Sequence, residues 1–217
     1  MFRLDGKRAL ITGGGTGIGF AIADVFARQG ATVALSGRRA DVLERAVSKL
    51  EASHGSGCAI YLQGDVSKVE GARAMVLDCI SRLGGLELLV NSAGSVDRVT
   101  SLESTIEGWC GADTHTQSPS IVQPTALPSV WREHSIASTN DCLRSVFVRD
   151  AIFDLNVRGT FITCQEAIRW MVAHGGGSIV NISSTASEKA YSPAASYGPS
   201  KAAVNNMSCV DETIVQP

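Results

Sequence analysis

A glycine-rich segment at residues 12–19, TGGGTGIG, constrains the fold of this chain more than any other feature. It follows an apolar run at Arg8–Thr12 that is typical of a buried strand, and it precedes apolar residues spaced for one helix face between Ile18 and Phe26. The amides of such a loop and the N-terminus of the next helix can hold a pyrophosphate. The alternative is a tight turn that needs glycine only for positive φ, although five glycines in eight residues exceed that need.

The glycine loop opens a regular alternation of short apolar runs and helical periods that continues to residue 109. Such alternation is typical of β-α units and a parallel sheet. Further strands are expected at 31–36, 58–62, 86–90 and 178–182, and helices at 42–50, 69–83 and 150–174, with a last helix starting near Ser196 and losing its period after Met207. Gly30 is expected to close the first helix. The predicted fold class is α/β: a Rossmann-like, doubly wound parallel sheet flanked by helices in a single domain over residues 1–217.

The alternation breaks at residues 110–149. This segment holds three of the six prolines and has no sustained strand or helix period, so it is predicted to be an irregular insert.

The composition excludes several classes of protein. Of 217 residues, 44% are hydrophobic and 18% charged, which suits one well-filled core. A net charge of −2 leaves no excess of positive charge that would favour binding to nucleic acid or to an anionic membrane. No apolar run near the start suits a secretory or membrane-spanning segment, so we expect a cytoplasmic protein with reduced cysteines. Cysteines and histidines are dispersed without metal-ligand spacing, and no metal site is expected.

Two arginines follow the second expected strand, where an acidic residue would hydrogen-bond the 2′-hydroxyl of an adenosine ribose. The residues there are Gly37, Arg38 and Arg39, and no carboxylate is present. Two guanidinium groups suit a 2′-phosphate, which favours NADP(H) over NAD(H). The alternative is that both arginines only solvate a loop.

Tyr197 and Lys201 are four residues apart where a helix can start, so their side chains can share one face. A phenol is ordinarily a poor acid or base at pH 7, but a neighbouring ammonium favours its phenolate. The tyrosine could then exchange a proton with a substrate hydroxyl or carbonyl. Ser184, at the carboxyl end of an expected strand, could orient the same oxygen. Taken alone, the Tyr197–Lys201 spacing also fits a pair on a helix surface.

These features occur together in a recognisable order. The chain carries TGGGTGIG, Asp65-Val66, NSAG at 91–94, Asn156, Ser184 in NISS, and Tyr197 with Lys201, and in this it resembles the short-chain dehydrogenase/reductase family over roughly residues 5–109 and 150–207. The resemblance implies that Tyr197 is the general acid/base, that Lys201 favours its phenolate and holds a ribose, that Ser184 positions the reacting oxygen, and that Asn156 supports a water linked to Lys201.

The same resemblance implies a set of cofactor contacts. They are Gly13, Gly15, Thr16, Gly17, Ile18, Gly19, Arg38, Arg39, Asp65, Val66, Asn91, Ala93, Gly94, Tyr197 and Lys201. For three residues, a role without any cofactor contact is the alternative: a helix N-cap for Asp65, a strand-end turn for Asn91 and a solvent-facing position for Asn156.

The chain departs from the family in two places. Joining Trp109 to Asp150 gives SLESTIEGWDAIFDLNVRGTF, which resembles an uninterrupted family sequence, so we interpret 110–149 as translated intron or a similar gene-model error; the alternative is a genuine lid or partner-binding loop. The family also adds strands and lid helices after the tyrosine-bearing helix, so the fold is predicted to be incomplete at its C-terminus. Weak folding and little or no turnover are expected.

Two classes of function therefore compete. The first is an NADP(H)-dependent oxidoreductase acting on a small carbonyl or secondary alcohol. The resemblance implies that an intact family member is a homo-oligomer in which the helix at 150–174 forms part of a subunit interface. The second is a truncated, inactive dinucleotide-binding protein. A family member with non-redox chemistry, such as a dehydratase or epimerase, is a third alternative, and the substrate class stays open.

Overall fold

The computed structural model describes residues 3–96, 150–189 and 196–214, with side chains as far as residue 208. The predicted insert at 110–149 lies outside the described residues. The elements in chain order are β1 (Arg8–Thr12), α1 (Gly17–Arg28), β2 (Thr32–Gly37), α2 (Ala40–His54), β3 (Ala59–Gln63), α3 (Val69–Leu83), β4 (Leu88–Asn91), a π-helical segment (Asp154–Gly159), α5 (Thr160–Ala173), β5 (Ser178–Asn181), a 3₁₀ turn (Thr185–Ser187) and α6 (Tyr197–Ile214).

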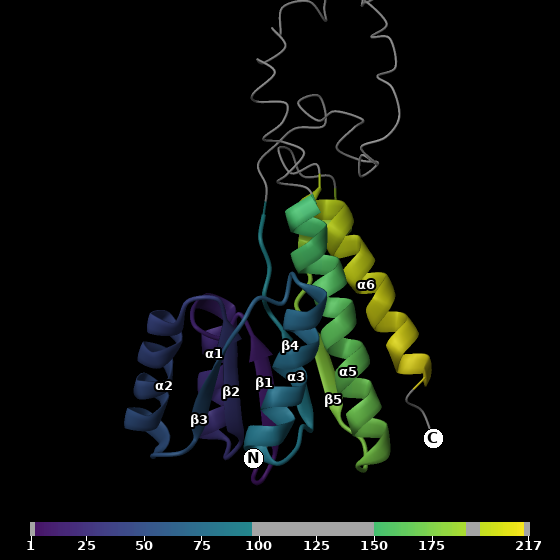
Figure 1. The fold of residues 1–217 in the computed structure, drawn as a ribbon. Coiled ribbons are helices and arrows are strands. Elements are labelled where there is room, and N and C mark those ends of the chain that lie inside the picture. Colours follow the sequence, from purple (N-terminus) through teal and green to yellow (C-terminus); the bar gives the residue numbers. More distant parts are fainter. Residues whose placement is uncertain (1–2, 97–149, 190–195, 215–217) are drawn as a thin grey trace, which may run out of the picture.

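The strands form one parallel sheet in the order β3-β2-β1-β4-β5 (Figure 1). The chain therefore runs outward from β1 to β3 and then returns to the other side of β1 with β4. Thr12, the last residue of β1, is in register with Ser36 of β2 and with Asn91 of β4. In doubly wound sheets, ligands bind where the strand order reverses, at the carboxyl ends of the strands. Here that point lies between β1 and β4, and the predicted fold class is confirmed.

Two apolar layers cover the two faces of the sheet. Successive residues of a strand point to opposite faces, so Leu10 packs in one layer and Ile11 in the other. The first layer joins the strands to α3 and α5, and the second joins them to α1 and α2 (Figure 1). Because both faces are buried, the strands are almost continuously apolar, as the sequence of β1 and β2 indicates.

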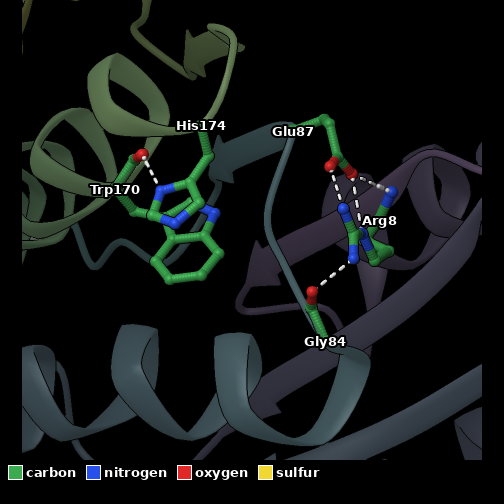
Figure 2. Close-up of polar contacts among 5 residues, drawn as sticks. All are labelled: Arg8, Gly84, Glu87, Trp170 and His174. Atoms are coloured by element: carbon green, nitrogen blue, oxygen red, sulfur yellow. Dashed lines mark hydrogen bonds and ion pairs between the residues drawn. The ribbon is translucent and has the colours of Figure 1, made fainter.

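A clamp of polar contacts holds the amino end of the sheet (Figure 2). Glu87 accepts hydrogen bonds from the backbone N (2.8 Å) and Nε (3.0 Å) of Arg8, and the Arg8 guanidinium also contacts the second carboxylate oxygen and the carbonyl of Gly84. The Arg8 hydrogen bond outweighs partial burial and holds the pKa of Glu87 below its ordinary value. At the end of α5, the His174 ring stacks on Trp170 with centroids 3.5 Å apart. The Arg8 contacts tie the start of β1 to the segment that precedes β4.

The structure corrects the sequence expectations in several details. Strand bounds shift by one or two residues in β2, β3, β4 and β5, and α6 extends to Ile214 although its apolar period is lost after Met207. Phe161 and Val172 share the apolar helical spacing of residues 150–174, which would predict a buried face, but they are 51% and 64% exposed. A π-helical segment interrupts that helix, and its i→i+5 hydrogen bonds add a residue to the turn, so a period counted through it loses register.

None of the described helices is both long enough and apolar enough to cross a membrane.

Candidate functional site

A cavity of about 600 Å³ lies at the carboxyl ends of the strands. Seven segments distant in sequence contribute to its walls. They are the glycine loop (Gly13, Gly15, Thr16, Ile18), the end of β2 with the start of α2 (36–39, Val42, Leu43), the end of β3 (64–66), the end of β4 (92–96), Leu155 of the π-helical segment, the end of β5 (Ile182, Ser183), and α6 (Tyr197, Lys201). The cavity therefore joins the predicted dinucleotide loop to the predicted reactive pair.

The glycine loop is shaped by positions where a side chain has no room. A Cβ on Gly19 would lie 2.5 Å from the carbonyl oxygen of Gly13, and a Cβ on Gly13 would lie 3.0 Å from the backbone of Ala93. Gly13 and Gly17 also adopt positive φ, 67° and 56°, which favours glycine. Gly17 and Gly19 do not line the cavity; Gly19 lets the start of α1 pack against the Gly13 backbone, whereas Gly17 has open space around it and is favoured by its positive φ. Helix α1 begins at Gly17 without a side-chain cap, so no N-cap side chain satisfies its first amides.

The end of β4 is anchored to its neighbours. The Thr12 hydroxyl accepts hydrogen bonds from the backbone N of Ser92 and of Ala93, both at 3.1 Å. The Asn91 amide donates to Asn181 Oδ1 (2.9 Å), and Asn91 Oδ1 accepts from Thr163 Oγ1 (2.8 Å). Asn91 is thus buried behind the wall and is absent from the cavity lining, whereas Ala93 and Gly94 line it.

Asn156, in the π-helical segment, connects the β4 loop to α6. Its Oδ1 accepts from the backbone N of Ser95 (2.9 Å), and its Nδ2 donates to the Ser95 carbonyl and to Ser200 Oγ, both at 3.0 Å. The side chain is fully buried, so the solvent-facing alternative for Asn156 is wrong. It does not line the cavity, but a Cβ on Gly94 would lie 3.4 Å from its Oδ1 and 3.5 Å from Lys201 Nζ.

Lys201 is buried with its ammonium at the cavity wall. Its Nζ donates to the carbonyl of Ile182 at 2.7 Å and lies 6.0 Å from the ring centroid of Tyr197. Burial lowers the pKa of Lys201 because it disfavours the charged form. Tyr197, the first residue of α6, is partly exposed and also lines the cavity. The predicted pair therefore comes together on one helix end.

The two serines that follow β5 behave differently. Ser184 Oγ accepts a hydrogen bond from the backbone N of Ala186 at 3.2 Å, capping the 3₁₀ turn, and the residue is absent from the cavity lining. Ser183 does line the cavity and donates to the carbonyl of Lys201 at 3.2 Å. The sequence prediction selected Ser184 and passed over Ser183, although both follow the same strand.

The other end of the cavity carries the predicted arginines and Asp65. Arg38 and Arg39 line the wall and are exposed. Asp65 Oδ1 accepts from the backbone N of Ser67 at 3.0 Å, in the manner of a turn or cap. Burial opposes ionisation of Asp65, but hydrogen bonds from Ser67 and the charges of Arg38 and Lys68 outweigh it and lower the pKa. Asp65 therefore both shapes the turn and faces the cavity.

Sequence reasoning missed several lining residues. Besides Ser183, the polar ones are Ser36, Ser92 and Ser95. Each lies at or just after the carboxyl end of a strand, and that position is the signal that identifies them in a parallel sheet.

The fold and the cavity are those of Rossmann-type nucleotide-binding proteins. The chain matches the short chain dehydrogenase family over residues 7–112 and 141–210, and it belongs to that family. The matched residues leave out 113–140, which falls within the segment expected to be an insert.

Similar proteins are named as dehydrogenases and reductases. The chain is 34% identical over 188 residues to a peroxisomal 2,4-dienoyl-CoA reductase of Arabidopsis thaliana (83% of this chain, 49% of the relative), and 31% identical over 180 residues to a probable galactose dehydrogenase of Rhizobium meliloti (83% and 54%). A short chain dehydrogenase of Burkholderia cenocepacia, solved in complex with NADP, has a TM-score of 0.69 and 28% identity (95% of this chain, 67% of that one). The chain spans about half the length of these two curated relatives.

Proposed function

We propose that this chain is an NADP(H)-dependent oxidoreductase that transfers hydride between the nicotinamide and a small carbonyl or secondary alcohol substrate. One observation carries the proposal: a single cavity of about 600 Å³ extends from the glycine loop and the arginines to Tyr197 and Lys201. The relatives named as dehydrogenases and reductases support this class of reaction.

The residues fit a dinucleotide. The loop lines the cavity with Gly13 and Gly15, which present backbone, and with Thr16 and Ile18, while Gly17 and Gly19 allow its close turn. The amides at the start of α1 suit the pyrophosphate. Arg38 and Arg39 suit a 2′-phosphate, for which we propose NADP(H), and the NADP complex of the Burkholderia neighbour supports this preference. Asp65 and Val66 would contact the adenine. Ala93 and Gly94 would contact the middle of the dinucleotide, and the buried Asn91 would hold the end of β4 in place without touching the cofactor.

The bound cofactor would supply or accept the hydride, and side chains of the protein would transfer the proton. Tyr197 would exchange the proton with the substrate oxygen, since its phenol lines the cavity. Lys201 would favour the phenolate and donate to the ribose, and Asn156 would hold α6 and the β4 loop in register. Ser184 would donate its hydroxyl hydrogen to the reacting oxygen from the loop after β5, a role that requires its side chain to turn toward the cavity beside Ser183.

A second candidate is a nucleotide-binding protein without turnover. The share of the curated relatives' length that the chain spans, 49% and 54%, keeps it open. The exposed Phe161 and Val172 on α5 support a homo-oligomer for an intact family member.

Two measurements on the purified chain separate these candidates: titration with NADPH followed by fluorescence, and NADPH oxidation with a panel of ketones. Binding with turnover that Tyr197→Phe abolishes supports the oxidoreductase. Binding without turnover supports the second candidate. No binding of NADPH contradicts both.

A further inference from the structure

Ser36, near the carboxyl end of β2, has a buried hydroxyl without a partner. Its side chain is 0% exposed, and across the described residues its Oγ is the one buried side-chain nitrogen or oxygen that has no hydrogen-bond partner. Buried polar groups in folded proteins are nearly always paired, because an unpaired one destabilises the folded state. The Ser36 hydroxyl therefore needs an explanation.

Thr12 provides a direct contrast. It is in register with Ser36 on the adjacent strand, so the two side chains point to the same face of the sheet. Thr12 is also buried, but its hydroxyl accepts hydrogen bonds from the backbone N of Ser92 and Ala93. Two neighbouring hydroxyls at the same edge thus differ: the β4 loop uses one, and no described residue uses the other.

The position of Ser36 identifies where its partner would come from. Ser36 lines the cavity together with the next three residues, Gly37, Arg38 and Arg39. The backbone N of Gly64 donates to the carbonyl of Gly37 at 2.9 Å, which brings the end of β3 and Asp65 to the same wall. This is the end of the cavity that carries the arginines, opposite the end at Tyr197.

We propose that the Ser36 hydroxyl hydrogen-bonds the adenosine half of the dinucleotide, at an atom common to NADPH, NADH and 2′,5′-ADP. Rotation about χ1 brings the hydroxyl toward the cavity when the nucleotide binds. The assignment rests on the proposed function, and it adds a contact that is independent of the two arginines and of the charge at the 2′ position.

The test compares Ser36→Ala with Thr12→Val in the full 217-residue chain. Thermal unfolding without ligand is measured first, and binding of 2′,5′-ADP and of NADPH is then measured by calorimetry. We expect Ser36→Ala to unfold at or above the wild-type temperature, because it removes an unpaired polar group, and to bind both nucleotides about 3- to 10-fold more weakly. Thr12→Val should unfold at a lower temperature, because it leaves two backbone amides without their acceptor.

Two results overturn the assignment. A Ser36→Ala chain that unfolds as early as Thr12→Val shows that the hydroxyl is satisfied inside the protein. Unchanged affinity for 2′,5′-ADP and NADPH shows that the nucleotide does not contact it. In both cases the wild type still binds nucleotide and the proposed function stands. A wild-type chain that binds neither nucleotide overturns the proposed function and this inference together.

Discussion

The two ends of the cavity are built in different ways. The end at the glycine loop comes mostly from one continuous stretch, β1 to β2, and its shape depends on backbone: a Cβ has no room at Gly13 or Gly19. The end at Tyr197 is assembled from the β4 loop, the π-helical segment, the β5 loop and α6. These segments are joined by side chains such as Asn156 and by the ammonium of Lys201.

The two ends of the cavity should therefore be sensitive to different kinds of substitution. A locally encoded backbone loop is disrupted by added atoms, whereas an end assembled from distant segments is disrupted by removing a single polar side chain. Changes at one end should therefore leave the other end measurable on its own, with 2′,5′-ADP reporting on the adenosine end and turnover on the reactive end.

The largest effect is expected for Tyr197→Phe, which removes the proposed proton donor while keeping the ring. Turnover should fall about 10²- to 10⁴-fold, with the affinity for NADPH nearly unchanged. Steady-state NADPH oxidation and fluorescence titration measure the two quantities. Tyr61→Phe is the matched control. The Tyr61 hydroxyl on β3 hydrogen-bonds Glu44 of α2 at an exposed site, and neither residue lines the cavity. Equal activity of Tyr197→Phe and wild type would remove the proposed role.

Asn156→Ala should destabilise the chain by about 3 kcal/mol, because the backbone N and the carbonyl of Ser95 and the hydroxyl of Ser200 each lose a hydrogen bond to the Asn156 side chain. Denaturant unfolding measures the change. Asn205→Ala loses one described hydrogen bond, to Ser187, and should show a clearly smaller change. At concentrations of denaturant where the variant is still folded, its affinity for 2′,5′-ADP should match wild type; a large loss of affinity would show that the two ends are not independent.

Gly19→Ala should impair the adenosine end of the cavity, which Asn156→Ala is expected to leave intact. Its Cβ would overlap the Gly13 carbonyl, so we expect about 2 kcal/mol of destabilisation and a loss of 2′,5′-ADP binding. In Gly37→Ala, the new Cβ meets only Leu43 side-chain atoms, 3.7 and 3.9 Å away, and stability should be nearly unchanged. Thermal unfolding of the two variants decides the point: similar melting temperatures would mean that the loop relaxes around an added methyl group.

The smallest effect is expected for Lys201→Met, and it should be a gain. Unlike loss of the neutral Asn156 amide, loss of the ammonium also removes a buried charge that disfavours the folded state. We expect this gain to exceed the loss of the hydrogen bond to the Ile182 carbonyl, so an apolar chain should stabilise the ligand-free protein by about 1 kcal/mol at pH 7. Lys189→Met, at an exposed site, should change little.

The sign of the pH dependence follows from the lowered pKa of Lys201. Between the folded pKa and the ordinary value of 10.5, the folded chain binds fewer protons than the unfolded chain, so wild-type stability rises with pH. The advantage of the Met variant should therefore shrink as the pH approaches 10.5. Unfolding curves for both chains across this range test it, and a constant or growing gap contradicts the burial argument.

The sequence alone predicted what depends on local pattern. The bounds of β1 and α3 follow from apolar periods within single elements, and the glycine loop follows from its own composition. The π-helical segment was missed because it carries no local signal in the period of apolar residues. Other features depend on segments that meet only in the folded protein, so the spacing of residues in the sequence does not predict them. They are the choice between Ser183 and Ser184 and the partners of Asn156 and Ser36.

The strand order has a consequence for synthesis on the ribosome. β1 lies at the centre of the sheet, yet its neighbour β4 begins only at Leu88. At about 5–20 residues per second, roughly 4 to 15 s pass between the synthesis of Thr12 and that of Leu88. The β1-α1-β2 unit can pair during this interval, but the other edge of β1 must wait for its partner, and its backbone groups stay hydrated until then. The glycine loop is thus translated long before the Ala93 backbone that packs against it.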